Sequence, residues 1–333
     1  MRCRRPRWRP SSRSCPDPGT GLTSAISTRG LSKRYKGVAA VDGLDLTVER
    51  GELYGFLGPN GAGKTTTIRM ALGLIRPSGG EVELLGEPVG ATHEGVLRRV
   101  GALIEEPGFW KYLSGRQNLD YFARAAGPPA DRAERMGRVD EVLHTVGLQD
   151  AAAKRVKAYS QGMRQRLGIA LALLGKPEVL MLDEPTNGLD PSGMREVRLL
   201  MRRLADEGTT VFVSSHLLAE VEAMCDRVGV LARGRLVAEG PPSELRTSGD
   251  TVRVEVDDRA RATQILANVD GASVVEDAEG AGGVRVRLTP PATAAGVNAA
   301  LVGGGVAVSA LSAERASLED VFMELTEGAD VPR

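Results

Sequence analysis

A glycine-rich stretch at residues 58–66 carries residue types that bind phosphate. It reads GPNGAGKTT, the Gly-x-x-x-x-Gly-Lys-Ser/Thr pattern, and lies between an apolar run and a helix-like stretch. Glycines allow backbone N–H groups to turn inward around phosphate oxygens, and the following helix adds the positive end of its dipole. Lys64 is expected to reach the β- and γ-phosphates, and the Thr65 hydroxyl to hold Mg²⁺. The expected phosphate-binding residues are Gly58, Pro59, Asn60, Gly61, Ala62, Gly63, Lys64, Thr65 and Thr66.

Two adjacent carboxylates, Asp183 and Glu184, end an apolar run at residues 179–182. Successive side chains of a strand point to opposite faces, so we expect separate tasks for the two groups rather than a shared proton. Asp183 would provide the second protein oxygen for the metal that a phosphate loop needs. Glu184, pointing the other way, would orient or deprotonate the water that attacks the γ-phosphate. A solvated strand end is the alternative interpretation.

A histidine, His216, ends a third apolar run, TTVFVSSH at residues 209–216. A lone histidine after a strand is more often structural or simply exposed. Here the other two apolar runs end in a phosphate loop and a carboxylate pair, and ligands bind at the carboxyl ends of the strands in open α/β sheets. We therefore expect three parallel strands whose ends lie side by side, with His216 contacting both the γ-phosphate and the attacking water.

A second anion-binding helix end is expected at residues 160–162. Ser160 reads as the N-cap of an amphipathic helix in AYSQGMRQRLGIALALL, and helix N-termini attract anions. The phosphate loop already surrounds one side of the nucleotide. A second site of this kind in one chain suggests phosphate shared with another subunit.

With these pieces in order, residues 26–245 resemble the ATP-binding subunit of an ABC transporter. GPNGAGKTT resembles Walker A, YSQGM the signature motif, VLMLDEP Walker B, GLDP the D-loop and SSH the H-loop, in the family's order. The resemblance implies an α/β fold, a P-loop NTPase of ABC type. Its expected parts are a RecA-like parallel sheet, an antiparallel β subdomain and an inserted helical subdomain at about residues 107–170. It also implies that two such domains sandwich two ATP molecules, each between Walker A of one subunit and the signature motif of the other.

The resemblance also implies roles for single residues. Tyr35 would stack on adenine, although an ordinary half-buried tyrosine is the alternative. Glu105 stands at the Q-loop position and would reach Mg²⁺ or its water. Gln161 and Met163 depart from the usual signature sequence, and these departures resemble the drug and antibiotic export branch. The implied ATP-binding set is completed by Ser160, Gln161, Gly162 and Asp190, the metal set is Thr65, Asp183 and Glu105, and the catalytic set is Glu184, His216 and Lys64.

Composition narrows the function classes. The chain has 333 residues with a formal net charge of zero, whereas a general nucleic-acid binder would carry a basic footprint. The longest strongly apolar run, residues 167–175, is far shorter than the ~20 residues of a membrane helix. Three unclustered cysteines make a disulfide framework or a metal site improbable and favour a reducing cytosol. The neutral charge argues against specific nucleic-acid binding, and the resemblance to a transporter subunit implies a peripheral protein at the cytoplasmic face of the cell membrane.

The two ends of the chain differ from its middle. Residues 1–25 are rich in Arg and Pro and cannot bury a core, so we interpret them as a disordered upstream extension. A tether to an anionic surface and a nucleic-acid arm are the alternatives.

Residues 250–329 show the order βαββαβ followed by a final helix at 317–326 with Ser317 as a possible cap, which predicts a small ferredoxin-like domain. It resembles the accessory domain of drug-export ATPases and is either regulatory or a stabilising cap.

The expected function is an ATP-hydrolysing subunit that powers export of a drug, antibiotic or lipid-like substrate. The resemblance implies a homodimer, or a pair with another ABC subunit, bound to separate transmembrane permease subunits. These would dock on the Glu105 loop and residues 107–125, where Phe109, Trp110 and Tyr112 form either an interface or a local core. A soluble ABC ATPase acting on the ribosome or DNA is the alternative. A nucleotide sensor without hydrolysis is disfavoured because the catalytic set is intact.

Overall fold

The computed structural model describes residues 24–90, 94–105, 108–126, 131–245, 250–275 and 283–315. The expected extension up to residue 23, and the final helix at 317–326, lie outside the described residues and stay predictions. The first strand begins at Ser24, two residues before the expected start of the ATP-binding region.

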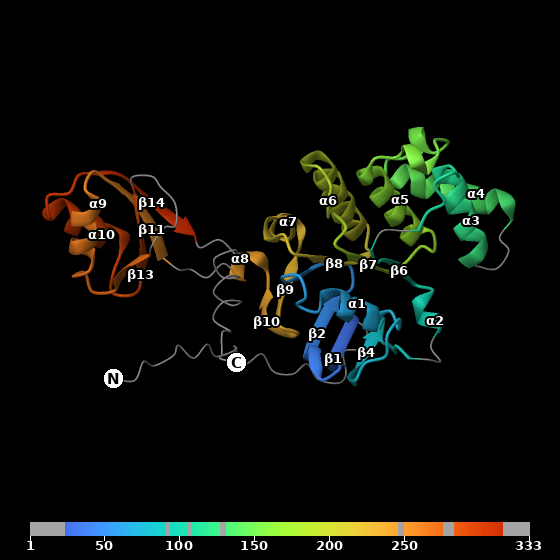
Figure 1. The fold of residues 1–333 in the computed structure, drawn as a ribbon, viewed down its shortest axis with the longest axis horizontal. Coiled ribbons are helices and arrows are strands. Elements are labelled where there is room, and N and C mark those ends of the chain that lie inside the picture. The colour runs from blue at the N-terminus through green and yellow to red at the C-terminus, as the bar shows by residue number, and fades with distance from the viewer. Residues whose placement is uncertain are drawn as a thin grey trace.

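A six-stranded sheet in the order β10-β9-β3-β8-β7-β6 forms the centre of the ATP-binding region (Figure 1). The three strands that carry the site motifs are neighbours and run parallel, as the sequence predicts. Every residue of these three strands is buried, which explains their continuous apolar sequences. The strands span Val100–Leu103 (β6), Leu53–Leu57 (β3), Val179–Asp183 (β7), Thr210–Ser215 (β8), Arg227–Ala232 (β9) and Arg235–Gly240 (β10).

Alternation along these strands builds two hydrophobic cores, one on each face of the sheet. Leu53 and Leu57 of β3 belong to one core, and Tyr54 and Phe56 to the other. The Phe212 ring of β8 stacks against Tyr54 with 5.7 Å between ring centroids. The helices of the parallel core are α1 (Lys64–Ala71), α5 (Gln161–Leu173), α6 (Pro191–Asp206) and α7 (Leu218–Met224).

An antiparallel sheet in the order β2-β1-β4-β5 packs against the second of these cores. Ile26, Leu31 and Leu44 are fully or nearly fully buried there together with Phe56 of the parallel sheet. This sheet corresponds to the expected antiparallel subdomain. Its strands are β1 (Ser24–Tyr35), β2 (Val38–Glu49), β4 (Gly79–Leu84) and β5 (Glu87–Pro88).

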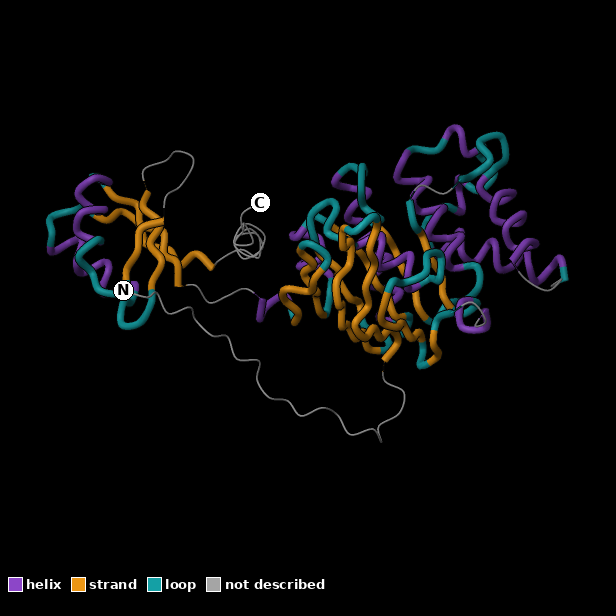
Figure 2. The backbone as a smooth tube through the Cα atoms, turned by 60° about the horizontal axis from the view of Figure 1, so that its bottom comes forward, coloured by secondary structure: helices purple, strands orange, loops and turns teal. Residues whose placement is uncertain are grey.

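Helices gather beside the two sheets, as Figure 2 shows in purple next to the orange strands. Leu119 of α3 and Leu143 of α4 are buried in the same core as Leu167 of α5, so these helices form one packed group. The helices and short helical turns here are α2 (Glu94–Leu97), α3 (Gly115–Ala126), α4 (Arg132–Thr145), η1 (Gln149–Ala151) and η2 (Val156–Ala158).

The C-terminal part forms a separate four-stranded antiparallel sheet in the order β12-β13-β11-β14 with its own hydrophobic core. The observed order βαββαβ confirms the expected ferredoxin-like arrangement over the described residues. A short helix, α8, precedes it. The elements are α8 (Pro242–Leu245), β11 (Asp250–Val256), α9 (Arg259–Leu266), β12 (Ala272–Val275), β13 (Gly283–Leu288), α10 (Ala294–Gly303) and β14 (Val308–Arg315).

Across the described ranges, no helix is both long enough and apolar enough to cross a membrane. Cys225, the free cysteine within the described part of the chain, is buried, and burial raises the pKa of its thiol far above the usual value.

Candidate active site

The phosphate loop joins the end of β3 to the start of α1. Gly63 is the N-cap of α1 and adopts φ 112°, and a Cβ at this position would lie 2.4 Å from the carbonyl oxygen of Ala40. Gly58 meets a similar restriction, since a Cβ there would lie 2.6 Å from the carbonyl oxygen of Leu231. Close backbone approach therefore requires glycine at both ends of the loop.

The Lys64 side chain points into this loop and is 6% exposed. Its Nζ donates to the carbonyl oxygens of Gly58, at 2.6 Å, and Pro59, at 3.2 Å. The same ammonium lies 3.2 Å from Glu184 Oε1, which joins the phosphate loop to the carboxylate that follows β7. Lys64 is thus held where a positive charge faces both the loop and the Glu184 carboxylate.

Asp183 connects the phosphate loop to β8. Its Oδ2 accepts a hydrogen bond from Thr65 Oγ1 at 2.7 Å, and its Oδ1 accepts one from Ser214 Oγ at 2.5 Å. Hydroxyl and carboxylate oxygens are the ligands that Mg²⁺ prefers, and such sites commonly use one or two protein oxygens with substrate phosphates. The donor set of Thr65 and Asp183 therefore fits Mg²⁺. The described residues contain no cluster of three or more His, Cys, Asp or Glu that could hold a metal without a substrate.

Glu184 lies one residue beyond β7, where the backbone turns with φ 49°. Its N–H donates to the Ser214 hydroxyl at 3.0 Å, which fixes the turn to the neighbouring strand. Strand alternation, the reason given for separating Glu184 from Asp183, is wrong at this position because Glu184 is not in the strand. Both carboxylates line the same pocket. The two carboxylates differ instead in their partners. Asp183 accepts hydrogen bonds from Thr65 and Ser214, whereas Glu184 contacts Lys64 and His216.

His216 contacts Glu184 directly. Its Nδ1 lies 2.7 Å from Glu184 Oε2, and the ring is about one-third exposed. Glu184 Oε1 is buried and makes no hydrogen bond to any described residue, although Lys64 lies within ion-pair distance. The carboxylate therefore has one oxygen in contact with the imidazole and the other within ion-pair distance of the Lys64 ammonium.

One pocket collects most of the expected metal and catalytic residues. Glu105, at φ 62°, is well exposed and forms an ion pair with Arg69 of α1, so its role toward Mg²⁺ stays a prediction. Gln165 and Asn187 also line this pocket, although the sequence motifs did not predict them. Gln165 stands between Arg164 and Arg166 in the sequence, so the local pattern gave no signal for it. The lining residues are Thr65, Glu105, Gln161, Gln165, Asp183, Glu184 and Asn187.

The signature segment begins α5 as expected. Ser160 is the N-cap and accepts a hydrogen bond from the N–H of Met163 at 3.2 Å. Gln161 Nε2 lies 3.5 Å from the carbonyl oxygen of Asn187, within the segment that leads to the D-loop. Asp190 caps α6 by accepting from the N–H of Gly193 at 3.3 Å. The single chain shows these local contacts, and binding of a partner's ATP stays a prediction.

Tyr35 ends β1 with 48% of its surface exposed, a value that fits both an adenine-stacking ring and an ordinary half-buried tyrosine. Lys33 Nζ lies 5.2 Å from its ring centroid. Stacking on adenine stays a prediction.

The aromatic residues after the Glu105 loop divide into two groups. Phe109 is 9% exposed and belongs to the core, so the local-core alternative holds for this residue. Trp110 is 42% exposed, and its ring lies 4.3 Å from that of Tyr121 on α3, which is also exposed. Tyr112 is exposed as well. We call Trp110, Tyr112 and Tyr121 the aromatic surface.

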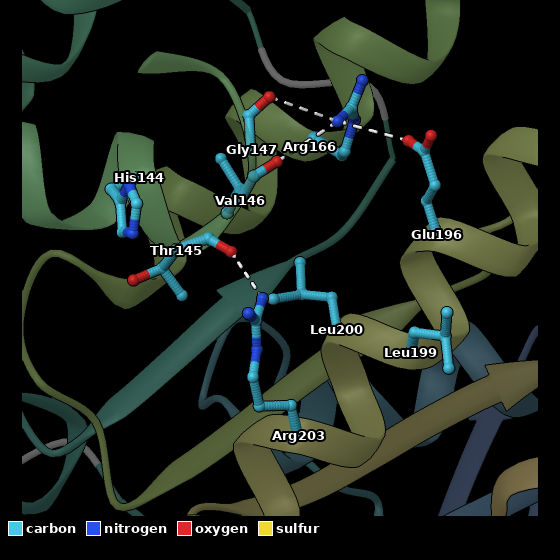
Figure 3. A pocket seen from close by; sticks show the side chains of 9 residues that line it. All are labelled: His144, Thr145, Val146, Gly147, Arg166, Glu196, Leu199, Leu200 and Arg203. Carbon is cyan, nitrogen blue, oxygen red and sulfur yellow. Dashed lines mark hydrogen bonds and ion pairs between the residues drawn. The ribbon is translucent and has the colours of Figure 1, made fainter.

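The residues at the end of α4 line a pocket together with residues of α5 and α6 (Figure 3). Arg203 of α6 donates to the carbonyl oxygen of Thr145 at 2.7 Å, and Arg166 of α5 pairs with Glu196 of α6 at 3.2 Å. Arginine at the last carbonyls of a helix satisfies them and complements the helix dipole. This pocket therefore shows how α4 is tied to α5 and α6. His144 lines it and is exposed, consistent with a structural residue rather than a ligand.

The chain matches two family models. The model described as ABC transporter matches residues 41–187, and the model described as ATP-binding protein DrrA1-3-like, C-terminal domain, matches residues 240–326. The bacitracin transport ATP-binding protein BcrA of Bacillus licheniformis is 40% identical, over 93% of this chain and 100% of that protein. The daunorubicin/doxorubicin resistance ATP-binding protein DrrA of Streptomyces peucetius is 38% identical, over 92% of this chain and 94% of that protein.

Solved structures agree in fold. CbiO1 from Clostridium perfringens, part of the ABC transporter complex cbiONQ, superimposes with a TM-score of 0.63 and 30% identity over 68% of this chain and 92% of that chain. The dimeric structure of MJ0796, a bacterial ABC transporter cassette, gives a TM-score of 0.60 at 25% identity over 65% of this chain and 98% of that chain.

Proposed function

This chain belongs to the ABC transporter ATP-binding family, and we propose that it binds and hydrolyses ATP with Mg²⁺ to power export of a drug, antibiotic or lipid-like substrate. The observation that carries the proposal is the contact of Glu184 with both His216 and Lys64, at 2.7 and 3.2 Å. The names of the bacitracin and daunorubicin relatives, each matched over more than nine-tenths of this chain, support the export assignment. They do not favour the alternative of a ribosomal or DNA-bound ATPase.

Hydrolysis would use the residues that end the three parallel strands. The backbone of the phosphate loop and the Lys64 ammonium bind the β- and γ-phosphates. Thr65 and Asp183 would hold Mg²⁺, which supplies charge neutralisation to the phosphates when bound. Glu184 accepts the proton of the attacking water, whose oxygen forms the new bond to the γ-phosphorus while the bond to the ADP oxygen breaks.

His216 fixes the base and contributes to the water site. An ionised carboxylate only accepts hydrogen bonds, so Nδ1 of His216 carries the proton in its contact with Glu184. In a neutral ring, Nε2 is then an acceptor and can bind an O–H of the attacking water. A donor contact from the same atom to the γ-phosphate requires the protonated imidazole.

A second copy of the family domain would complete each nucleotide site. Ser160 and the N-terminus of α5 provide an anion-binding end, and the dimeric structure of MJ0796 supports pairing of two such cassettes. We propose a homodimer, or a pair with a second ABC subunit, in the ATP-bound state.

The aromatic surface is proposed to dock separate transmembrane subunits at the cytoplasmic face of the membrane. Exposed Trp and Tyr side chains are enriched at protein interfaces. The backbone N–H of Trp110 donates to Asn118 Oδ1 at 2.9 Å, so the backbone at Trp110 is anchored to α3. For the C-terminal domain we propose a regulatory or assembly role.

Two measurements test the function. The purified full chain, incubated with Mg²⁺ and ATP, should release phosphate, and the Glu184→Gln variant should not. Membrane vesicles that contain the chain with its permease subunits should show ATP-dependent export of bacitracin or daunorubicin. Phosphate release that is absent from both the isolated chain and the assembled transporter would overturn the proposal, whereas hydrolysis without export would limit it to the ATPase activity.

A further inference from the structure

The segments that follow β7 and β8 run side by side and are joined by hydrogen bonds at three successive levels. Glu184 N–H donates to both the carbonyl and the hydroxyl oxygen of Ser214, at 3.2 and 3.0 Å. Glu184 Oε2 then contacts His216 Nδ1 at 2.7 Å. Further along, Thr186 Oγ1 donates to Glu220 Oε2 at 2.5 Å. The first two levels belong to the proposed mechanism, and the third has no role in it.

Thr186 and Glu220 are almost completely buried, at 3% and 4% exposed. Glu220 lies on α7, which begins two residues after His216. Its carboxylate has no ion-pair partner among the described residues, and its Oε1 makes no hydrogen bond to them. Burial of a carboxylate with so few partners costs stability. A leucine or methionine would fill the same volume without that cost, so packing alone does not explain a glutamate here.

We propose that Glu220 is a positioning residue for ATP hydrolysis. Through Thr186 it fixes the segment that follows Glu184, and so holds the Glu184 carboxylate at its observed distance from His216. This inference rests on the proposed function, because Glu220 is buried, does not line the pocket of Asp183 and Glu184, and acts only through these residues.

The backbone around Glu184 explains why such a restraint is needed. Glu184 adopts φ 49°, a left-handed conformation that non-glycine residues hold only where their surroundings fix it. Thr186 follows two residues later, and its carbonyl oxygen accepts a hydrogen bond from Leu189 N–H at 3.2 Å. Thr186 therefore fixes the turn toward α7 through its side chain and toward the D-loop through its backbone. Loss of the Glu220 contact removes the side-chain restraint that holds this turn toward α7.

The test compares variants that remove the bond with variants that keep it. Thr186→Val deletes the donor at nearly unchanged volume, and Thr186→Ser keeps it. Thr186→Val combined with Glu220→Met replaces both partners by apolar groups, an exchange that can be nearly neutral for folding. Thr28→Val is the matched control, because Thr28 is equally buried and donates to Leu44 O at 2.9 Å in the antiparallel sheet. For each variant, kcat, the KM for ATP and the melting temperature are measured on the full chain.

Thr186→Val and the double variant should lower kcat roughly tenfold or more with KM within about twofold, since misplacement of a base affects the chemical step more than binding. Thr186→Ser should restore kcat. Thr28→Val should lower the melting temperature as much as Thr186→Val does, while its kcat stays at the wild-type value. Glu220→Asp, which keeps the carboxylate but is one methylene shorter, should show the same kcat loss and provides the test where the Thr186 variants do not fold.

Wild-type kcat in the double variant or in Glu220→Asp would overturn the inference. So would an equal kcat loss in Thr28→Val at an equal loss of melting temperature. These outcomes are distinct from failure of the proposed function. A wild-type chain without phosphate release would remove the function itself, whereas activity that depends on Glu184 but not on the Thr186–Glu220 bond would remove only this inference.

Discussion

His216 Nδ1 lies 2.7 Å from Glu184 Oε2, although the two residues are 32 positions apart in the sequence. The contact joins the end of one buried parallel strand to the end of its neighbour. It leaves Glu184 Oε1 without a hydrogen bond to the described residues and facing Lys64. This arrangement has consequences that mutations can test.

Replacing Glu184 by Gln should leave ATP binding nearly intact and slow hydrolysis by roughly 10²–10⁴-fold, because the amide keeps the shape but cannot take a proton. The variant should accumulate as an ATP-bound dimer. Phosphate release and size-exclusion chromatography measure both effects. Glu207→Gln, an exposed glutamate at the end of α6, is the control. Turnover within a few-fold of wild type in Glu184→Gln would remove Glu184 from the role of base.

Lys64→Ala should lose nucleotide affinity, since the Lys64 ammonium is the main protein charge expected on the β- and γ-phosphates. Equilibrium titration with a fluorescent ATP analogue gives the dissociation constant. The control is Lys154→Ala, which removes an exposed lysine outside the phosphate loop. Unchanged affinity in Lys64→Ala would show that the loop at residues 58–66 is not the phosphate site.

Ser214→Ala should raise the Mg²⁺ concentration needed for half-maximal activity about tenfold or more, because groups that orient a metal ligand typically affect affinity by 10–100-fold. Ser214 Oγ donates to Asp183 and also accepts from the N–H of Glu184. Ser215→Ala is the control, since the Ser215 hydroxyl bonds Leu217 instead of Asp183. A Mg²⁺ dependence identical to that of wild type would contradict a role of Ser214 in orienting Asp183.

Trp110→Ala should weaken co-purification with the transmembrane partner about fivefold or more, because truncated anchor residues account for much of the binding energy at interfaces. ATP binding by the isolated chain should be unaffected. Leu74→Ala, at a leucine that is also exposed but lies after α1, is the control. Normal pairing of Trp110→Ala with the partner, or unfolding of the isolated chain, would show that the aromatic surface is not the docking site.

Asp120→Asn should lower the free energy of unfolding at pH 7 by about 0.5–1 kcal/mol. Hydrogen bonds from Arg124 and Arg135 lower the pKa of Asp120 in the folded state. A lowered folded-state pKa adds stability above the unfolded value of about 3.9, and that stability is lost as the pH falls through the folded value.

Thermal unfolding from pH 7 down to about pH 3 measures this difference. The gap between wild type and Asp120→Asn should shrink at the acid end of the range. Asp140→Asn serves as the control, because the pair between Arg116 and Asp140 is about half exposed on both sides and should contribute less. A gap that persists unchanged at the acid end would show that the charge of Asp120 is not the cause.

Much of the fold follows from local sequence. Two of the three buried runs that precede the site end in polar side chains, and the third leads into the glycine-rich loop. Parallel strands place those ends at one edge. The phosphate loop needs glycine at positions 58 and 63, where a Cβ would meet backbone atoms. The turn residues and the alternation of apolar and polar residues along the chain likewise predict the βαββαβ order of the C-terminal domain.

Tertiary structure alone decided how the candidate catalytic groups meet. The left-handed turn at Glu184 places both carboxylates in one pocket, which strand alternation did not predict, because the turn is held by contacts to Ser214 on another strand. The partners of Thr186 and Phe109 were also beyond prediction, since one bonds a glutamate 34 residues away and the other enters a core shared by distant helices. Local pattern determines which residues end each strand, whereas the distances between those ends depend on how separate segments pack together.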